Sequence, residues 1–431
     1  PPPPPVFQAE DGIRDPDHSL VGSEMCIRDR KMSGFPDQLP VDIIPLFETV
    51  DDLKRASNVM EILYRDEVYR EHVRQRGNQQ TIMLGFSDGT KDGGYLMANW
   101  SIFKAKEELS RISRKHNIKV IFFDGRGGPP ARGGGKTHQF YASLGPTIEN
   151  QEIQLTIQGQ TISSNFGTID SSQYNLEQLM SSGVSNEIFD AGNNRLTEDE
   201  VALMNDLATR SYKAYSDFKS HPKFLAYLEN MSTLKYYAKT NIGSRPSKRK
   251  SSDTLDFSDL RAIPFVGSWS QLKQNVPGFF GVGSALQKFE DEGRFEEVVR
   301  FYNNSKFFKS LIYNSMMSMK KSFFDLTRYM ENDPEFGEFW RLIYAEFLNS
   351  KRLVLKLANQ TELMQDYPES KASIEVREEI VLPLLTIQQY ALKKVKDLQG
   401  ESEADQSKRA VYEKIITRSL FGNINASRNS A

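Results

Sequence analysis

The residues with the clearest chemical potential form a loop rich in glycine and arginine. Residues 124–135 read Asp-Gly-Arg-Gly-Gly-Pro-Pro-Ala-Arg-Gly-Gly-Gly and follow the apolar run Lys119-Val-Ile-Phe-Phe123. Glycines allow positive φ and a close approach of the backbone to a ligand. The planar cations of Arg126 and Arg132 suit phosphate or carboxylate oxygens. We predict an anion-binding active-site loop. A flexible loop is the alternative, and the RGG elements of nucleic-acid-binding tails recur many times without a preceding strand.

Charged residues also follow two earlier apolar runs. Glu48 follows the run at 41–47, and Asp88 and Lys91 follow the run at 81–86. In a β/α barrel the carboxyl ends of the strands meet on one face, so these side chains would converge with the arginine loop. Two carboxylates from neighbouring strands suit Mg²⁺ or Mn²⁺. Taken singly, Glu48 or Asp88 is more typical of a helix N-cap or a solvated acid.

The elements that must position these residues alternate between strand and helix. We expect strands at 41–47, 81–86, 119–123 and 153–157, a glycine-rich turn after 86, and helices at 51–75, 94–116 and 137–144. This alternation predicts a parallel sheet or barrel. Four strands make half of an eight-stranded barrel, unless runs such as 261–266 add to it.

Beyond about residue 170 the pattern is helical. Apolar residues recur with a spacing near 3.6 in five stretches, at 197–219, 286–302, 307–331, 335–360 and 370–399. Residues 239–259 are typical of a long loop, and 401–408 of a charged, solvated connection.

Composition narrows the class of protein. The 431 residues carry a net charge of −2 and are 38% hydrophobic, as expected for a globular protein. They give no support for a nucleic-acid or membrane surface, and no apolar run approaches the ~20 residues of a membrane span. The only cysteine, Cys26, excludes disulfides and fits a reducing cytoplasm. The five histidines lack the spacing of a zinc site.

The first thirty residues lack any helical or strand period. They resemble a translated sequencing adapter, and they have no unbroken apolar segment of the kind that a signal peptide needs. This interpretation makes Cys26 foreign to the protein and the chain a fragment.

Six motifs together resemble the phosphoenolpyruvate carboxylase family. They are PLFET at 45–49, FSDGTKDGG at 86–94, DGRGGPPARGGG at 124–135, GSRPSKRK at 243–250, LRAIPF at 260–265 and RNSA at 428–431. Their order matches the family, and they cover nearly everything from residue 41 to the end. One departure stands out, because Asp124 replaces the histidine that usually opens the arginine loop.

The resemblance implies a role for each matching residue. It makes Glu48 and Asp88 the ligands of Mg²⁺ or Mn²⁺, Lys91 and Arg132 catalytic, and Arg126, Arg261, Arg245, Gly127 and Gly128 substrate-binding. Arg132 would stabilise the carboxylated product or intermediate. The implied reaction converts phosphoenolpyruvate and bicarbonate to oxaloacetate and phosphate, through carboxyphosphate and an enolate. Aspartate or malate would inhibit it by binding Lys320, Arg377 and Asn429, with Arg132 captured from the loop.

The resemblance also implies an architecture. The expected fold is a mostly helical (β/α)₈ barrel of the TIM type, with its C-terminal part at 31–270 and an α-helical allosteric and assembly region at 271–431. The full-length enzyme would be a cytoplasmic homotetramer. The family's N-terminal half, which this chain lacks, supplies a catalytic histidine and another arginine, so the chain alone is expected to be inactive. The alternatives are another phosphoenolpyruvate-using barrel enzyme and a non-catalytic effector-binding or assembly module.

Overall fold

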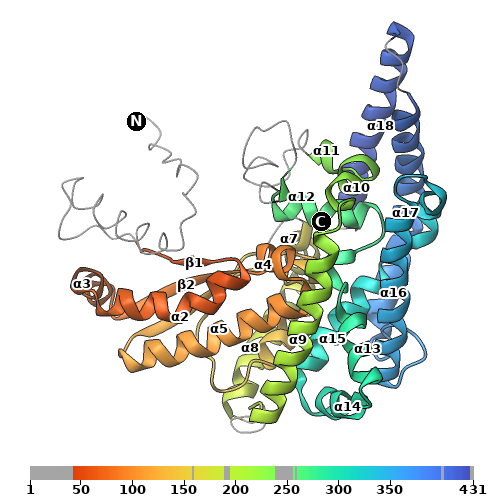
Figure 1. Cartoon of the computed structure of the whole chain (residues 1–431). Coiled ribbons are helices and arrows are strands. Elements are labelled where there is room, and N and C mark those ends of the chain that lie inside the picture. The colour runs from red at the N-terminus through yellow and green to blue at the C-terminus, as the bar shows by residue number, and fades with distance from the viewer. Residues whose placement is uncertain are drawn as a thin grey trace, which may run out of the picture.

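The computed structural model is a mostly helical α/β protein built beside a small parallel sheet (Figure 1). It describes residues 42–157, 160–188, 195–237, 256–257, 260–398 and 402–427. The adapter-like segment, Arg245 and Asn429 lie outside the described residues.

The sheet has four parallel strands in the order β1-β2-β3-β4. Their bounds are Leu46–Phe47 for β1, Gln79–Gly85 for β2, Lys119–Gly125 for β3 and Ile153–Leu155 for β4. Met83 pairs with Leu46 on one side and with Phe123 on the other. Because the strands are parallel, their carboxyl ends, which carry the predicted site residues, lie along the same edge.

Helices cross over between successive strands, as parallel pairing requires. α2 (Val50–Arg65) and α3 (Glu67–Gln75) join β1 to β2, and α4 (Phe86–Gly93) and α5 (Tyr95–Lys115) join β2 to β3. α2 begins at a capping box, in which the Thr49 hydroxyl and the Asp52 carboxylate each accept a backbone N–H of the other residue. The residues at 88–93, which we expected to form a turn, therefore belong to helix α4.

The remaining elements are helical. They are η1 (Pro130–Arg132), α6 (Thr137–Ala142), α7 (Gln160–Phe166), α8 (Ile169–Ile188), α9 (Glu198–Lys219), α10 (Phe224–Met231), α11 (Leu234–Tyr237), α12 (Ala262–Gln271), η3 (Val276–Gly278), α13 (Val282–Asp291), α14 (Phe295–Asn304), α15 (Lys306–Lys320), η4 (Phe324–Asn332), α16 (Gly337–Ala358), α17 (Pro368–Asp397) and α18 (Glu403–Ser427). In Figure 1 α9 stands between the sheet and the helices α13 to α16, and α17 and α18 run side by side at the far edge.

One hydrophobic core joins the sheet to these helices. It extends from Phe47 in β1 to Ile374 in α17. Phe218 of α9 stacks on Phe280 and on Phe339, with ring centroids 4.0 and 5.2 Å apart. The core thus continues on both sides of residue 270, and the division into two domains there stays a prediction.

Four of the segments assigned from the sequence differ in the structure. The stretch 286–302 is broken because Gly293, with φ of 70°, ends α13 before α14 begins. The stretch 307–331 consists of α15 and the 3₁₀ helix η4. Arg261 is the N-cap of helix α12 and residues 262–266 form its first turns instead of a strand, with most of their side chains buried. The expected connection at 401–408 is largely the start of α18. Across the part of the chain that the structure describes, every helix is too short or too polar to span a membrane.

Candidate active site and a neighbouring cationic pocket

Two carboxylates lie at the ends of neighbouring strands. Glu48 directly follows β1, and Asp88 lies in the first turn of α4, which follows β2. Gly85 makes room for Glu48, since a Cβ atom at Gly85 would come within 2.9 Å of the Glu48 Cγ. Asp88 in turn is close enough to Arg132 to influence its ionisation. Strand order therefore brings one acidic residue from each strand to the edge where the arginine loop begins.

Lys91 is buried and points toward the segment that precedes α12. Its Nζ donates to the backbone carbonyl of Leu260 at 2.6 Å and lies 4.8 Å from the centre of the Phe257 ring. Only 6% of Lys91 is exposed. Arg261 is the next residue after Leu260 and forms the N-cap of α12. The structure thus brings two predicted site residues together that are 170 positions apart in the sequence.

Arg132 is packed into the same edge of the sheet. It ends the 3₁₀ turn η1, is 1% exposed, and donates from Nε to the Ser87 hydroxyl at 3.1 Å. Burial lowers the pKa of its guanidinium to about 10, and the Asp88 carboxylate opposes that shift. Gly127 lies directly against it, because a Cβ atom there would come within 2.8 Å of the Arg132 Cβ. This glycine is therefore needed for the arginine to fold back onto the loop.

Arg126 faces a cavity on the other side of the loop. The cavity has a volume of about 370 Å³ and is lined by Arg126, Gly127 and Gly128 together with residues of α7 and α8. The Arg126 Nε donates to the carbonyl of Gly133, and its guanidinium carbon lies 4.3 Å from the centre of the Phe140 ring. Its Nη1 is buried and has no hydrogen-bond partner among the described residues. An anion in the cavity would satisfy this donor.

The loop holds its shape through close contacts that exclude larger side chains. A Cβ atom at Gly134 would come within 1.8 Å of the Gly128 carbonyl oxygen, and Gly133 has φ of 79°. Both positions therefore require glycine.

Asp124, the unusual residue that opens the loop, forms a buried ion pair. Its Oδ2 lies 2.7 Å from the Nζ of Lys106 on α5, and neither side chain is more than 1% exposed. Lys106 was not among the site residues predicted from the sequence. Its position on the buried face of α5, four residues from Ile102 and three from Leu109, was the available signal.

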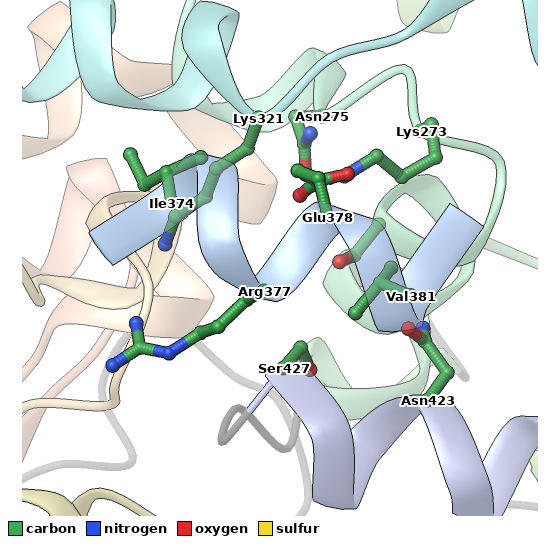
Figure 2. Close-up of a pocket in the computed structure, with 10 residues that line it drawn as sticks. Lys273, Asn275, Lys321, Ile374, Arg377, Glu378, Val381, Asn423 and Ser427 are labelled. Atoms are coloured by element: carbon green, nitrogen blue, oxygen red, sulfur yellow. The ribbon is translucent and has the colours of Figure 1, made fainter. Parts of the chain in front are cut away.

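A cationic pocket lies beside the helical region and is bordered by α15, α17 and α18. Lys273, Lys321 and Arg377 line it together with Glu378, Asn275 and Asn423. Figure 2 shows Lys321 and Arg377 pointing to one side of the pocket, whereas Lys273 and Glu378 meet on the other, with Nζ and Oε1 2.6 Å apart. Burial, together with the positive charges of Lys273 and Arg377, lowers the pKa of Lys321 to about 8. A group of cations of this kind favours an anionic ligand.

Lys320, the lysine expected beside Arg377, lies elsewhere. Its Nζ forms an ion pair with Glu375 at 2.7 Å, and it does not line the cationic pocket. One residue of shift turns a helical side chain by about 100°, so the adjacent Lys321 enters the pocket instead. The predicted partners Asn429 and Arg245 fall outside the described residues, and their roles stay predictions.

The donor set suits a hard divalent cation. No cluster of three or more His, Cys, Asp or Glu residues occurs in the described ranges. Mg²⁺ is commonly held by one or two carboxylates, with water and substrate oxygens completing the octahedron. Glu48 and Asp88 match that pattern of ligands in type and number.

Comparison with known proteins agrees with the motifs. The family model for phosphoenolpyruvate carboxylase matches residues 25–426. The phosphoenolpyruvate carboxylase of Corynebacterium diphtheriae is 35% identical over 365 residues, which cover 82% of this chain and 40% of that protein. Those of Nitrosomonas eutropha and Rhodothermus marinus are 34% and 31% identical, each over 86% of this chain and 40% of their own length. The chain thus spans about two fifths of these relatives.

Proposed function

Since the chain belongs to the phosphoenolpyruvate carboxylase family, we propose that the complete polypeptide containing it converts phosphoenolpyruvate and bicarbonate to oxaloacetate and phosphate. The observation that carries this proposal is the buried guanidinium of Arg126: the residue lines a cavity of about 370 Å³ at the carboxyl edge of the sheet, and its Nη1 has no hydrogen-bond partner among the described residues. A buried guanidinium of this kind suits a phosphate ester. We also propose that the four strands belong to a (β/α)₈ barrel, because parallel strands with helical crossovers are its repeating unit.

The residues of the site divide the reaction between them. Arg126 and Arg261 bind the phosphate of phosphoenolpyruvate, and Gly127 and Gly128 let the backbone approach it. Glu48 and Asp88 hold Mg²⁺ or Mn²⁺, which neutralises charge on phosphate and enolate oxygens. Lys91 lies beside the Arg261 segment as a catalytic cation. Arg132 stabilises the species formed when carbon dioxide meets the enolate, inside a loop that excludes water.

A coupled assay tests this proposal directly. The complete protein, supplied with phosphoenolpyruvate, bicarbonate and Mg²⁺, is expected to form oxaloacetate, which malate dehydrogenase reduces with loss of NADH absorbance. Omitting bicarbonate is the control and should stop the signal. A folded protein that forms no oxaloacetate contradicts the proposal, and aspartate binding without turnover would favour a non-catalytic effector module.

The cationic pocket is a candidate site for an inhibitory dicarboxylate such as aspartate or malate. Lys321 and Arg377 supply the positive charge. A small cavity beside Lys321 is lined by Pro129, Pro130 and Ala131 of the arginine loop. A ligand held by Lys321 would therefore lie next to the loop that carries Arg132, which gives it a route to restrain that arginine.

Replacing Lys321 with methionine is expected to weaken inhibition by malate about tenfold or more, because a buried charge-assisted hydrogen bond is lost. The matched control is Lys320→Met, which removes the adjacent lysine and its surface ion pair with Glu375 and should leave inhibition nearly unchanged. Inhibition constants for malate, measured in the coupled assay, decide between them. A larger effect of Lys320→Met would show that Lys320, and not Lys321, binds the inhibitor.

Inhibition by malate should also depend on pH. The lowered pKa of Lys321, about 8, means that the free pocket loses this charge as pH rises through 8. The bound dianion favours the protonated lysine, so affinity is full below pH 8 and falls above it, by at most about tenfold per pH unit. Malate has no group that titrates there. Inhibition constants at about pH 7 and about pH 9 should diverge in the wild type and converge in Lys321→Met.

We further propose that the complete protein is a cytoplasmic homotetramer. The support for assembly is a row of exposed apolar side chains along α17, formed by Val376, Ile380, Ile387 and Tyr390. Exposed apolar rows of this kind mark protein interfaces. Light scattering on the complete protein measures its mass, and a monomer at working concentration would contradict the proposal.

A further inference from the structure

The buried ion pair behind the arginine loop has no part in the roles assigned above. Lys106 and Asp124 are 1% and 0% exposed, and their Nζ and Oδ2 atoms are 2.7 Å apart. The lysine is enclosed by aromatic rings, with Nζ 5.0 Å from the centre of Phe122 and 5.6 Å from that of Phe140. Two charges buried among rings cost free energy that a pair of apolar side chains would not. Asp124 is the first residue of the loop, so this pair is placed to act on the loop as well as to fill the core.

Tyr141 of α6 connects this pair to the loop. Its hydroxyl donates to the Oδ2 of Asp124 at 2.5 Å. Burial and the charge of Asp124 raise its pKa well above the usual range, so the hydroxyl keeps its proton. Because that proton is directed at Asp124, the lone pairs of the phenolic oxygen remain for a donor, and the Arg126 guanidinium carbon lies 5.7 Å from the centre of the same ring.

These contacts orient the Arg126 guanidinium from several sides. The Gly133 carbonyl accepts from its Nε, and its guanidinium carbon lies 4.3 Å from the centre of the Phe140 ring and 5.7 Å from the centre of the Tyr141 ring. Its Nη1 is buried and lacks a partner among the described residues, and Arg126 lines the cavity. A ligand in the cavity would therefore meet the guanidinium in the orientation that these contacts set.

We propose that Lys106, Asp124 and Tyr141 form a positioning unit that sets the direction of Arg126 for the phosphate of its substrate. Lys106 holds the Asp124 carboxylate, the carboxylate orders the Tyr141 hydroxyl, and the hydroxyl orders the guanidinium. This inference rests on the proposed function, in which Arg126 binds a phosphate ester. It adds three residues that act through Arg126 without touching the substrate.

The cleanest test is Tyr141→Phe, which keeps the ring and the ion pair and removes only the hydroxyl. We expect KM for phosphoenolpyruvate to rise about tenfold, the loss of one hydrogen bond to a charged group, while kcat changes less than about threefold. The matched control is Tyr64→Phe, since Tyr64 is also fully buried and its hydroxyl contacts Ser113 far from the loop. A KM in Tyr141→Phe equal to that of Tyr64→Phe would overturn the proposal.

Two double variants separate positioning from packing. Lys106→Met/Asp124→Asn leaves Tyr141 an acceptor and should keep KM near the wild-type value. Lys106→Met/Asp124→Leu removes the acceptor and should raise KM about as much as Tyr141→Phe, although Tyr141 and Arg126 are unchanged. Equal KM values in the two double variants would contradict the proposal. A wild-type protein without carboxylase activity would instead refute the proposed function, so the two failures are distinguishable.

Discussion

Oxaloacetate formation by the complete Arg132→Ala protein is expected to fall about 100- to 1,000-fold, the usual effect of removing a preorganised donor from a developing anion. Arg132 is buried, its Nε is held by Ser87, and it lies near the Asp88 carboxylate. The coupled malate dehydrogenase assay measures the loss.

Phosphate release should fall less than oxaloacetate formation in this variant. The proposed role of Arg132 begins after bicarbonate has attacked phosphorus, so carboxyphosphate can still form and decompose. Arg132→Lys keeps a charge but lacks the planar fork, and it should recover only part of the rate. Arg111→Ala is the control, because Arg111 is an exposed arginine paired with Glu108 on α5. An equal fall in both products would move Arg132 to the phosphoryl-transfer step.

Much of the sheet could be predicted because its strands carry strong local signals. β3 coincides with the apolar run at 119–123 extended by two residues, and β2 with the run at 81–86 begun two residues earlier. β1 was harder. Of the strand expected at 41–47, Leu46 and Phe47 pair with β2. A strand forms where a neighbouring strand can share backbone hydrogen bonds with it, and the sequence of β1 alone does not specify that partner.

Helix ends were less predictable than helix existence. Apolar spacing indicated helices in five stretches but not the long helices α8 and α18, and it continues through Gly293, whose positive φ separates α13 from α14. Spacing near 3.6 records which face is buried and carries little information about where the chain turns. The helix α12 at 262–271 is buried nearly all round, so its short apolar run carries no helical period and also suits a strand.

Some features of the candidate site could be predicted from the sequence and others could not. Residues that follow strands, such as Glu48, Asp88 and Arg126, were predictable in position because parallel strands end on one edge. Contacts between distant segments were not, and the contact of Lys91 with the carbonyl of Leu260 needed the fold. Of the two adjacent lysines, Lys321 lines the cationic pocket and Lys320 pairs with Glu375 of α17, a difference that the apolar spacing of α15 does not specify.

Replacing Lys106 alone with methionine is expected to lower the free energy of unfolding by about 3–5 kcal/mol, because the Asp124 carboxylate would stay buried without its counter-charge. Burial lowers the pKa of Lys106, and the negative charge and hydrogen bond of Asp124 oppose that shift. The control is Lys104→Met on the same helix, where the lysine is 38% exposed and 3.8 Å from Glu107, and where the loss should stay below about 1 kcal/mol. Thermal and urea unfolding of the complete proteins measure both.

Lys106→Met/Asp124→Leu should recover most of the lost stability, since neutral apolar side chains fill the same space among the rings. A stable Lys106→Met protein would mean that Asp124 is neutral in the fold, and the ion pair would then not be what holds Tyr141 and Arg126.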